Sequence, residues 1–217
     1  MLFRSYHING SVVKGFPKNF DSGVPGLSPL AIADFDNDGN KEVFMEKPIT
    51  SSVSGCGTKI IRLYRLDGTK LLDKSIVSDE PSEYCENILL IYTHGNFNAP
   101  VIGDYDNDDK LEIFITSGKT LHGYKYDGAS VSGFPKTIPN QKSGYSYGIL
   151  PGAVADFNGD GKNEFAYIVS HSYAVKTAKK QELVIQNSSG SIISNFSLKA
   201  NWHVWGIKAA DANGQES

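Results

Sequence analysis

The sequence lacks several features that mark other classes of protein. It has no run of about 18 apolar residues, which excludes a membrane-spanning helix. It has no cluster of basic residues of the kind that contacts nucleic acid, so we expect no nucleic-acid partner. Methionine, tryptophan and cysteine occur only twice each, whereas tyrosine and phenylalanine occur 11 times each and glycine 22 times. Aromatic residues suit half-buried pleated surfaces and glycine suits turns, so this composition favours β structure.

The acidic residues are distributed unevenly along the chain. Of the 24 aspartates and glutamates, 12 lie in three short windows at 34–42, 104–112 and 156–164. The net charge of −3 would become +3 if three divalent ions were bound, so the charge of the ion-free chain says little about partners.

The three windows align without a gap and form an internal repeat. Each has acidic or amide residues at positions one, three and five and a glutamate at position nine, and an incomplete fourth copy begins at Asp211. A second repeat lies between the windows, where 6–17 matches 124–135 position for position and 64–72 is a diverged copy. Its Asn-Gly and Asp-Gly pairs predict hairpin turns between apolar runs.

The spacing of the repeats predicts an all-β fold, a β-propeller of four-stranded antiparallel blades. The acidic windows recur about every 50–70 residues, which accommodates four short strands per unit. In each unit the acidic loop would join the first two strands and the Asp-Gly turn the last two. We therefore expect a single partial propeller domain over 1–217. Three complete blades and two partial ones are expected, at 27–76, 98–138, 150–198, 1–20 (end of a blade) and 203–217 (start of a blade).

The acidic loops carry the oxygen ligands that calcium prefers. Calcium takes six to eight oxygens, and alternating side chains with a backbone carbonyl can surround one point. The expected ligands come from positions one, three, five, seven (as a carbonyl) and nine of each loop: Asp34, Asp36, Asp38, Asn40, Glu42; Asp104, Asp106, Asp108, Lys110, Glu112; Asp156, Asn158, Asp160, Lys162, Glu164. Asn158 removes one negative charge, so we expect the third site to be the weakest.

Two other interpretations of local motifs are disfavoured. An EF-hand opens with the same spacing but needs a glutamate at position twelve, where this chain has Met45, Ile115 and Tyr167. Simple polar turns would not repeat the position-nine glutamate three times. The stretch 144–148 matches the nucleophile pattern Gly-x-Ser-x-Gly, but Pro151 and a predicted strand follow instead of a helix, which predicts a loop without catalytic chemistry.

On its acidic loops and Gly-Phe-Pro segments, taken as the ends of fourth strands, the chain resembles the FG-GAP/VCBS-type repeats. These repeats occur in integrin α-subunit heads, bacterial surface proteins, some fungal lectins and certain polysaccharide lyases. The Phe-Gly and Gly-Ala-Pro signatures of the family are not clearly present, so the resemblance indicates no subfamily. It implies that about three calcium ions hold the loops and that the chain is a secreted or cell-surface module for adhesion or for binding a protein or glycan. The alternative it leaves open is the propeller of a carbohydrate-active enzyme such as a polysaccharide lyase.

The connections on the opposite side of the blades carry the remaining candidate features. Cys56 and Cys85 lie in two connections that share one face, which predicts a disulfide and an oxidising compartment; two free thiols are the alternative. The same face would carry five side chains that either stack on a ligand or fill the gap between blades: Tyr145, Tyr147, Trp202, His203, Trp205. Because three blades seldom close a ring, we also expect self-association or the remainder of a larger propeller.

Overall fold

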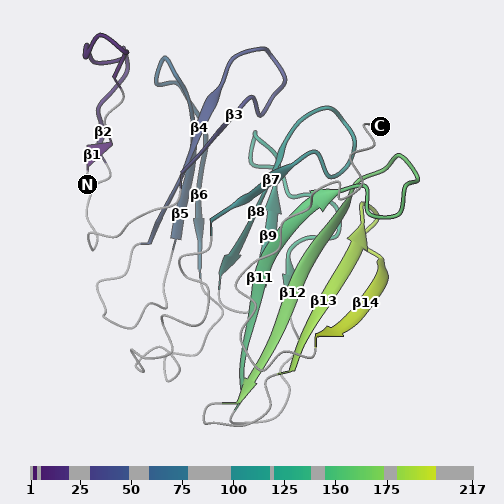
Figure 1. Cartoon of the computed structure of the whole chain (residues 1–217). Coiled ribbons are helices and arrows are strands. Elements are labelled where there is room, and N and C mark those ends of the chain that lie inside the picture. Colours follow the sequence, from purple (N-terminus) through teal and green to yellow (C-terminus); the bar gives the residue numbers. More distant parts are fainter. Residues whose placement is uncertain are drawn as a thin grey trace.

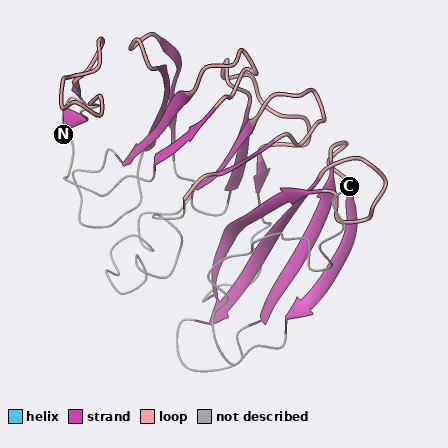
Figure 2. Cartoon of the chain, turned by 45° about the horizontal axis from the view of Figure 1, so that its top comes forward, coloured by secondary structure: helices cyan, strands magenta, loops and turns pink. Residues whose placement is uncertain are grey.

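The computed structural model describes residues 2–3, 6–19, 30–48, 59–77, 99–117, 120–137, 145–173 and 180–198. Every regular element in these ranges is a β-strand, which confirms the all-β prediction. Figures 1 and 2 show three sheets standing side by side in chain order, with a small hairpin at the N-terminal side.

Each large sheet is a four-stranded antiparallel meander in which neighbouring strands are consecutive in the chain. The first sheet consists of β3 (Leu30–Ala33), β4 (Glu42–Pro48), β5 (Lys59–Arg65) and β6 (Lys70–Ile76). The second consists of β7 (Val101–Gly103), β8 (Glu112–Ser117), β9 (Thr120–Tyr124) and β10 (Lys136–Thr137). The third consists of β11 (Tyr145–Ala155), β12 (Glu164–Tyr173), β13 (Lys180–Asn187) and β14 (Ile192–Leu198). The N-terminal hairpin pairs β1 (Leu2–Phe3) with β2 (Lys18–Asn19).

The hairpin turns follow one pattern in all three sheets. In the first, the Arg65 N–H donates to the Thr69 carbonyl at 2.8 Å and the Gly68 N–H donates to the Arg65 carbonyl at 2.9 Å. The same pair of hydrogen bonds recurs at Lys125 and at Asn187. The turn glycine has a φ of +88° in the first sheet, a conformation that glycine adopts without a steric penalty. The turns predicted from the Asp-Gly pairs are therefore confirmed.

The hydrophobic core lies between the sheets. One cluster joins Phe35, Phe44 and Leu63 of the first sheet to Ile113 and Ile115 of the second. A second cluster joins Tyr105, Phe114 and Phe134 of the second sheet to Phe165 and Tyr167 of the third. All six residues of β8 are buried because the side chains on both faces of this strand meet a neighbouring sheet. Each sheet therefore depends on the next one to cover its apolar face.

Close contacts between backbones fix the spacing of neighbouring sheets. A Cβ added at Gly133, within the Gly-Phe-Pro segment, would lie 2.8 Å from the Cα of Gly190, the turn glycine of the third sheet. A Cβ added at Gly15 in the N-terminal copy would meet the Asp67 backbone in the same way. The ammonium of Lys136 then donates to the Gly190 carbonyl at 2.8 Å. The Gly-Phe-Pro segments thus mark where one unit meets the turn of the following unit.

Two sequence-based expectations need correction. The segment 145–148 is not a loop, because it pairs with the far end of β12 as part of the long strand β11. No helix follows this segment within the described residues, so the exclusion of a nucleophile elbow holds. The second Gly-Phe-Pro does not end the fourth strand; it precedes the short strand β10.

Several predictions fall outside the described residues. These include both cysteines and the candidate aromatic residues near the C-terminus: Cys56, Cys85, Trp202, His203, Trp205. The same holds for the partial blade expected at 203–217. The side chains of Tyr145 and Tyr147 are likewise outside the description, although both residues belong to β11. Ring closure and the domain limits stay predictions.

The contact between the second and third sheets gives a stability prediction. A Cβ at position 103 would lie 2.5 Å from the Cβ of Val154, so Gly103→Ala must push β7 away from β11. We expect a loss of about 1–3 kcal/mol in the free energy of unfolding, measured by urea denaturation. Ala33 occupies the same place in the first sheet, and A33G is the matched control, with a loss of about 0.5–1 kcal/mol. A stability of G103A equal to that of the unmutated chain would contradict the close approach.

Candidate metal centres

The three acidic loops share one backbone framework. In the first, the carboxylate of Asp34 accepts the N–H groups of Asp38 at 3.0 Å and Gly39 at 2.8 Å, which closes the loop on its own first residue. Gly39 has a φ of +87°, and Asp109 adopts the corresponding left-handed conformation in the second loop with a φ of +65°. This confirms that an aspartate can replace the glycine at position six.

Position four of the loops also bends the chain, which we did not predict. Asn37 and Asn107 have φ values of +57° and +58°, and Gly159 stands at the same place in the third loop with +78°. Asparagine and glycine are the residues that enter the left-handed region most readily, so their recurrence at position four was the available signal.

The glutamate at position nine lies at the base of each loop and is buried. Glu42 and Glu112 are fully buried and Glu164 is 1% exposed. In each loop one carboxylate oxygen accepts the N–H of the residue at position two, at 2.9 Å from Phe35, 2.7 Å from Tyr105 and 2.9 Å from Phe157. The loops differ in what contacts the second oxygen of this carboxylate.

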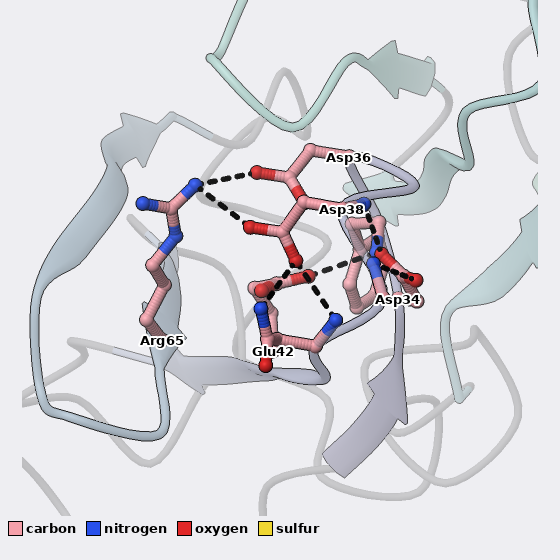
Figure 3. Close-up of polar contacts among 8 residues, drawn as sticks. Asp34, Asp36, Asp38, Glu42 and Arg65 are labelled. Atoms are coloured by element: carbon pink, nitrogen blue, oxygen red, sulfur yellow. Dashed lines mark hydrogen bonds and ion pairs between the residues drawn. The ribbon is translucent and has the colours of Figure 1, made fainter.

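In the first loop the second oxygen of Glu42 has no donor among the residues that the structure describes (Figure 3). Within the described residues, Glu42 Oε1 and Asp36 Oδ1 are buried and have no hydrogen-bond partner. Carboxylate oxygens of Asp34, Asp36 and Glu42 lie within 4.8 Å of one another. Burial and the nearby aspartates raise the pKa of Glu42. Two buried anionic oxygens without donors, close to a third carboxylate, form a centre that a cation would neutralise.

A cation of the protein holds the outer side of this centre. The guanidinium of Arg65, at the end of β5, donates to Asp36 Oδ2 at 2.7 Å and lies 3.4 Å from Asp38 Oδ2 (Figure 3). Arg65 thus contacts one oxygen of Asp36, and the other oxygen has no partner within the described ranges. Such contacts from behind a ligand fix its orientation in metal sites.

The second loop repeats this arrangement with a lysine. Lys125 Nζ lies 2.7 Å from Asp106 Oδ2 and 2.7 Å from Asp108 Oδ2. Asp106 Oδ1 and Glu112 Oε1 are buried without a partner among the described residues, as in the first loop. Oxygens of Asp104, Asp106 and Asp108 lie within 4.8 Å of one another. Burial, followed by the charges of the aspartates, raises the pKa of Glu112 to about 7.

The third loop has the same backbone but a different set of partners. Asp156 accepts the N–H groups of Gly159 at 2.6 Å and Gly161 at 2.8 Å. The side-chain amide of Asn158 donates to Asp160 Oδ2 and to Glu164 Oε1, each at 3.2 Å. Both oxygens of Glu164 therefore have donors, and the carboxylates of the third loop do not form a close group of the kind found in the other two.

The structure thus brings together only some of the expected ligands, and the set differs between the loops. It gathers the side chains at positions one and three with position nine in the first loop and with position five in the second. Asn40, Lys110 and Lys162, expected to offer carbonyls, donate their N–H groups to the position-five carboxylates at 2.8, 3.0 and 2.9 Å; their carbonyls as ligands stay a prediction. The contacts of Arg65 and Lys125 were not predicted, and the available signal was the position of both residues three places before the turn glycine.

The loops also contact one another across the sheets. The Leu111 N–H, at position eight of the second loop, donates to the Phe35 carbonyl at 3.0 Å. Asn163, at the same position of the third loop, donates its N–H to Asn107 Oδ1 at 2.9 Å and its amide to the Asp104 carbonyl at 2.6 Å. The acidic loops of successive sheets are therefore neighbours along one edge of the stack.

Comparison with known families agrees with this repeat geometry. Residues 104–167 match the family described as FG-GAP-like repeat. The matched segment includes the second and third acidic loops and ends within β12, so this part of the chain is an FG-GAP-type repeat. The comparison with curated proteins gave no match. In the described part of the chain no helix has the length and apolar character needed to cross a membrane.

The buried charge of Glu112 generates a stability prediction for the ion-free protein. In calcium-free buffer at pH 8, E112Q should raise the free energy of unfolding by about 2 kcal/mol, because it removes a charge that burial disfavours. The folded-state pKa, about 7, lies above the usual value of 4.5, so the native wild type takes up a proton as pH falls. The gain therefore shrinks between pH 8 and pH 6.

The control for this variant is E164Q. Both oxygens of Glu164 already accept hydrogen bonds, so its amide substitution should give no comparable gain. Urea denaturation of the two variants at both pH values makes the comparison. Equal gains in the two loops would contradict the distinction between them.

Proposed function

We propose that the chain is a binding module of the β-propeller type whose acidic loops hold calcium as a structural ion. The observation that carries the proposal is the pair of buried carboxylate oxygens in each of the first two loops that have no donor in the described part of the chain. Leaving such oxygens uncompensated costs free energy, and a bound cation removes that cost.

The donor set favours calcium over other ions. All candidate ligands are oxygens, with three or more carboxylates per loop in the first two, which suits a hard cation of double charge. The candidate ligands there are the side chains at positions one, three, five and nine and the carbonyl at position seven: Asp34, Asp36, Asp38, Asn40, Glu42; Asp104, Asp106, Asp108, Lys110, Glu112. The ion supplies positive charge that holds these oxygens together. Arg65 and Lys125 orient the position-three aspartates from the outer side.

The role proposed for the ion is structural because the loops are also points of contact between sheets. Tyr105, at position two of the second loop, donates its hydroxyl to the Asn187 carbonyl and accepts a hydrogen bond from Gln186 Nε2 at 3.0 Å. An ion that fixes the second loop would therefore also fix the position of the third sheet. This supports a module stiffened by calcium.

We further propose that the module is secreted or at the cell surface and binds a protein or a glycan. The FG-GAP-like repeat at residues 104–167 and the acidic loops support this assignment. Incubating the purified protein on a glycan array, once with calcium and once with chelator, tests the glycan case. Binding that disappears with chelator supports the proposal, and binding that is equal in both conditions contradicts a role for the ion in presenting the surface.

Calcium should stabilise the protein measurably. An ion that binds only the folded state adds about 2.7 kcal/mol at a hundred times its dissociation constant, which corresponds to about 5–10 °C in Tm for a chain of this size. Thermal denaturation followed by circular dichroism, with calcium and with chelator, measures the shift. A Tm that does not respond to calcium would refute the metal assignment.

The position-nine variants localise the effect. E42Q and E112Q should each reduce the calcium-dependent rise in Tm, because each removes a carboxylate that faces the proposed ion. D127N is the matched control, since Asp127 lies in an exposed turn where asparagine is equally suited. Reductions of the same size in all three variants would indicate a general effect of charge.

A further inference from the structure

Successive units of the chain contact one another at two places that lie at fixed distances from the turn glycine. In the first sheet the residue six places after the turn glycine is Lys74. Its ammonium lies 4.4 Å from the centre of the Tyr124 ring in the second sheet and donates to the Gly128 carbonyl at 2.7 Å. Tyr124 lies four residues before Gly128, the turn glycine of its own sheet. The segment after one turn therefore packs on the turn of the next unit.

The second and third sheets use the same two places. Phe134, six residues after Gly128, belongs to the cluster between these sheets and is only 8% exposed. Gln186, four residues before Gly190, is fully buried and donates to the hydroxyl of Tyr105 in the second sheet. The contact between units is therefore repeated, with its two halves on successive sheets.

One half of this contact is exposed on the third sheet. Phe196 lies six residues after Gly190, and in the register of β14 it takes the place that Lys74 takes in β6. Its side chain is 52% exposed, whereas Phe134 at the same place is buried. Phe157, in the acidic loop of the third sheet, is exposed as well. The third sheet therefore offers an apolar surface at the place where the first two sheets contact the next unit.

The other half is exposed on the N-terminal hairpin. Tyr6 lies four residues before Gly10 and is 53% exposed, whereas Tyr124 at the corresponding place is 7% exposed. Among the described residues no atom lies within 4 Å of a Cβ added at Gly10. A Cβ added at Gly128 would lie 2.8 Å from Leu72 Cδ1 of the preceding sheet. The hairpin thus offers the surface that, in the second sheet, the preceding sheet covers.

The two exposed halves lie at opposite ends of the row of sheets (Figures 1 and 2). Neither is buried against the other within one chain, as the exposure of Phe196 and Tyr6 shows. Each half matches the one at the opposite end, because both belong to the contact that joins the chain's own sheets. Complementary surfaces at two ends of a molecule produce a head-to-tail contact between copies.

We propose that the third sheet of one copy docks on the N-terminal hairpin of a second copy, with Phe196 against Tyr6. The contact continues the packing between sheets, and an aromatic pair takes the place of the Lys74 ammonium on the Tyr124 ring. Burial of the exposed rings stabilises it. The contact requires no ion in the acidic loops, so it is independent of the proposed calcium binding.

Light scattering of the full chain over a range of concentrations measures this assembly. The wild type should reach at least twice the mass of one chain. F196D and Y6D should each raise the dissociation constant about tenfold or more, because each places a charge in an apolar contact. The matched control is S197D, since Ser197 is exposed and its side chain points to the opposite face of β14. This variant should associate as the wild type does.

Mixing the two aspartate variants tests the head-to-tail geometry. Each variant keeps one intact half, so the Phe196 end of Y6D can dock on the Tyr6 end of F196D. An equimolar mixture should therefore regain the mass of two chains at concentrations where each variant alone is a monomer. The mixed pair should stop at two chains, because both of its remaining ends carry aspartate.

Several outcomes would overturn the contact: a wild type that is monomeric at every concentration, association of F196D or Y6D equal to that of the wild type, or a mixture that stays monomeric. Circular dichroism verifies the fold of each variant. If an aspartate variant folds poorly, F196S and Y6S replace the pair, because serine removes the ring without adding a charge.

Discussion

The structure depends on a buried glutamate at the base of each acidic loop. Glu42, Glu112 and Glu164 lie where the second strand of a sheet begins, and each accepts an N–H from position two of its own loop. A buried carboxylate must be compensated, because an uncompensated charge away from water is costly. The backbone path of each loop, from the first strand to the second, is arranged around that requirement.

The same residues couple the loops to the stacking of the sheets. Phe35 and Tyr105, whose N–H groups hold the glutamates, bury their rings completely in the clusters between sheets. Tyr105 packs edge-on against Phe165 of the third sheet with ring centroids 6.4 Å apart. Phe157, at the same position of the third loop, is 37% exposed. In the first two loops, the backbone N–H of the position-two residue binds the glutamate of its own loop. The ring of the same residue packs between that sheet and the next one.

The loops differ in the groups that surround the second oxygen of the position-nine glutamate. The first two place a cation from the end of the third strand behind the position-three aspartate, and the inner oxygens there have no hydrogen-bond partner among the described residues. In the third, the side-chain amide of Asn158 donates hydrogen bonds to Asp160 and Glu164. One backbone framework therefore carries different partners around the same buried glutamate. The third unit differs from the first two at Asn158 and Asn187, which are 29 residues apart in the chain.

The sequence by itself determined the all-β fold, the four-strand units, the Asp-Gly turns and the place of the acidic loops. These follow from local rules: alternation of apolar residues, glycine in left-handed turns and the regular spacing of the repeat. Only the tertiary structure showed that Arg65 and Lys125 face the loops, that β11 continues back to Tyr145, and that Asn158 bridges Asp160 and Glu164. The contacts of Arg65 and Lys125 join a strand end to a loop of the same sheet. The contact of Asn158 depends on which oxygen of Glu164 already accepts a backbone N–H. Such facts are set by packing and hydrogen bonding across the sheet, and no periodicity along the chain encodes them.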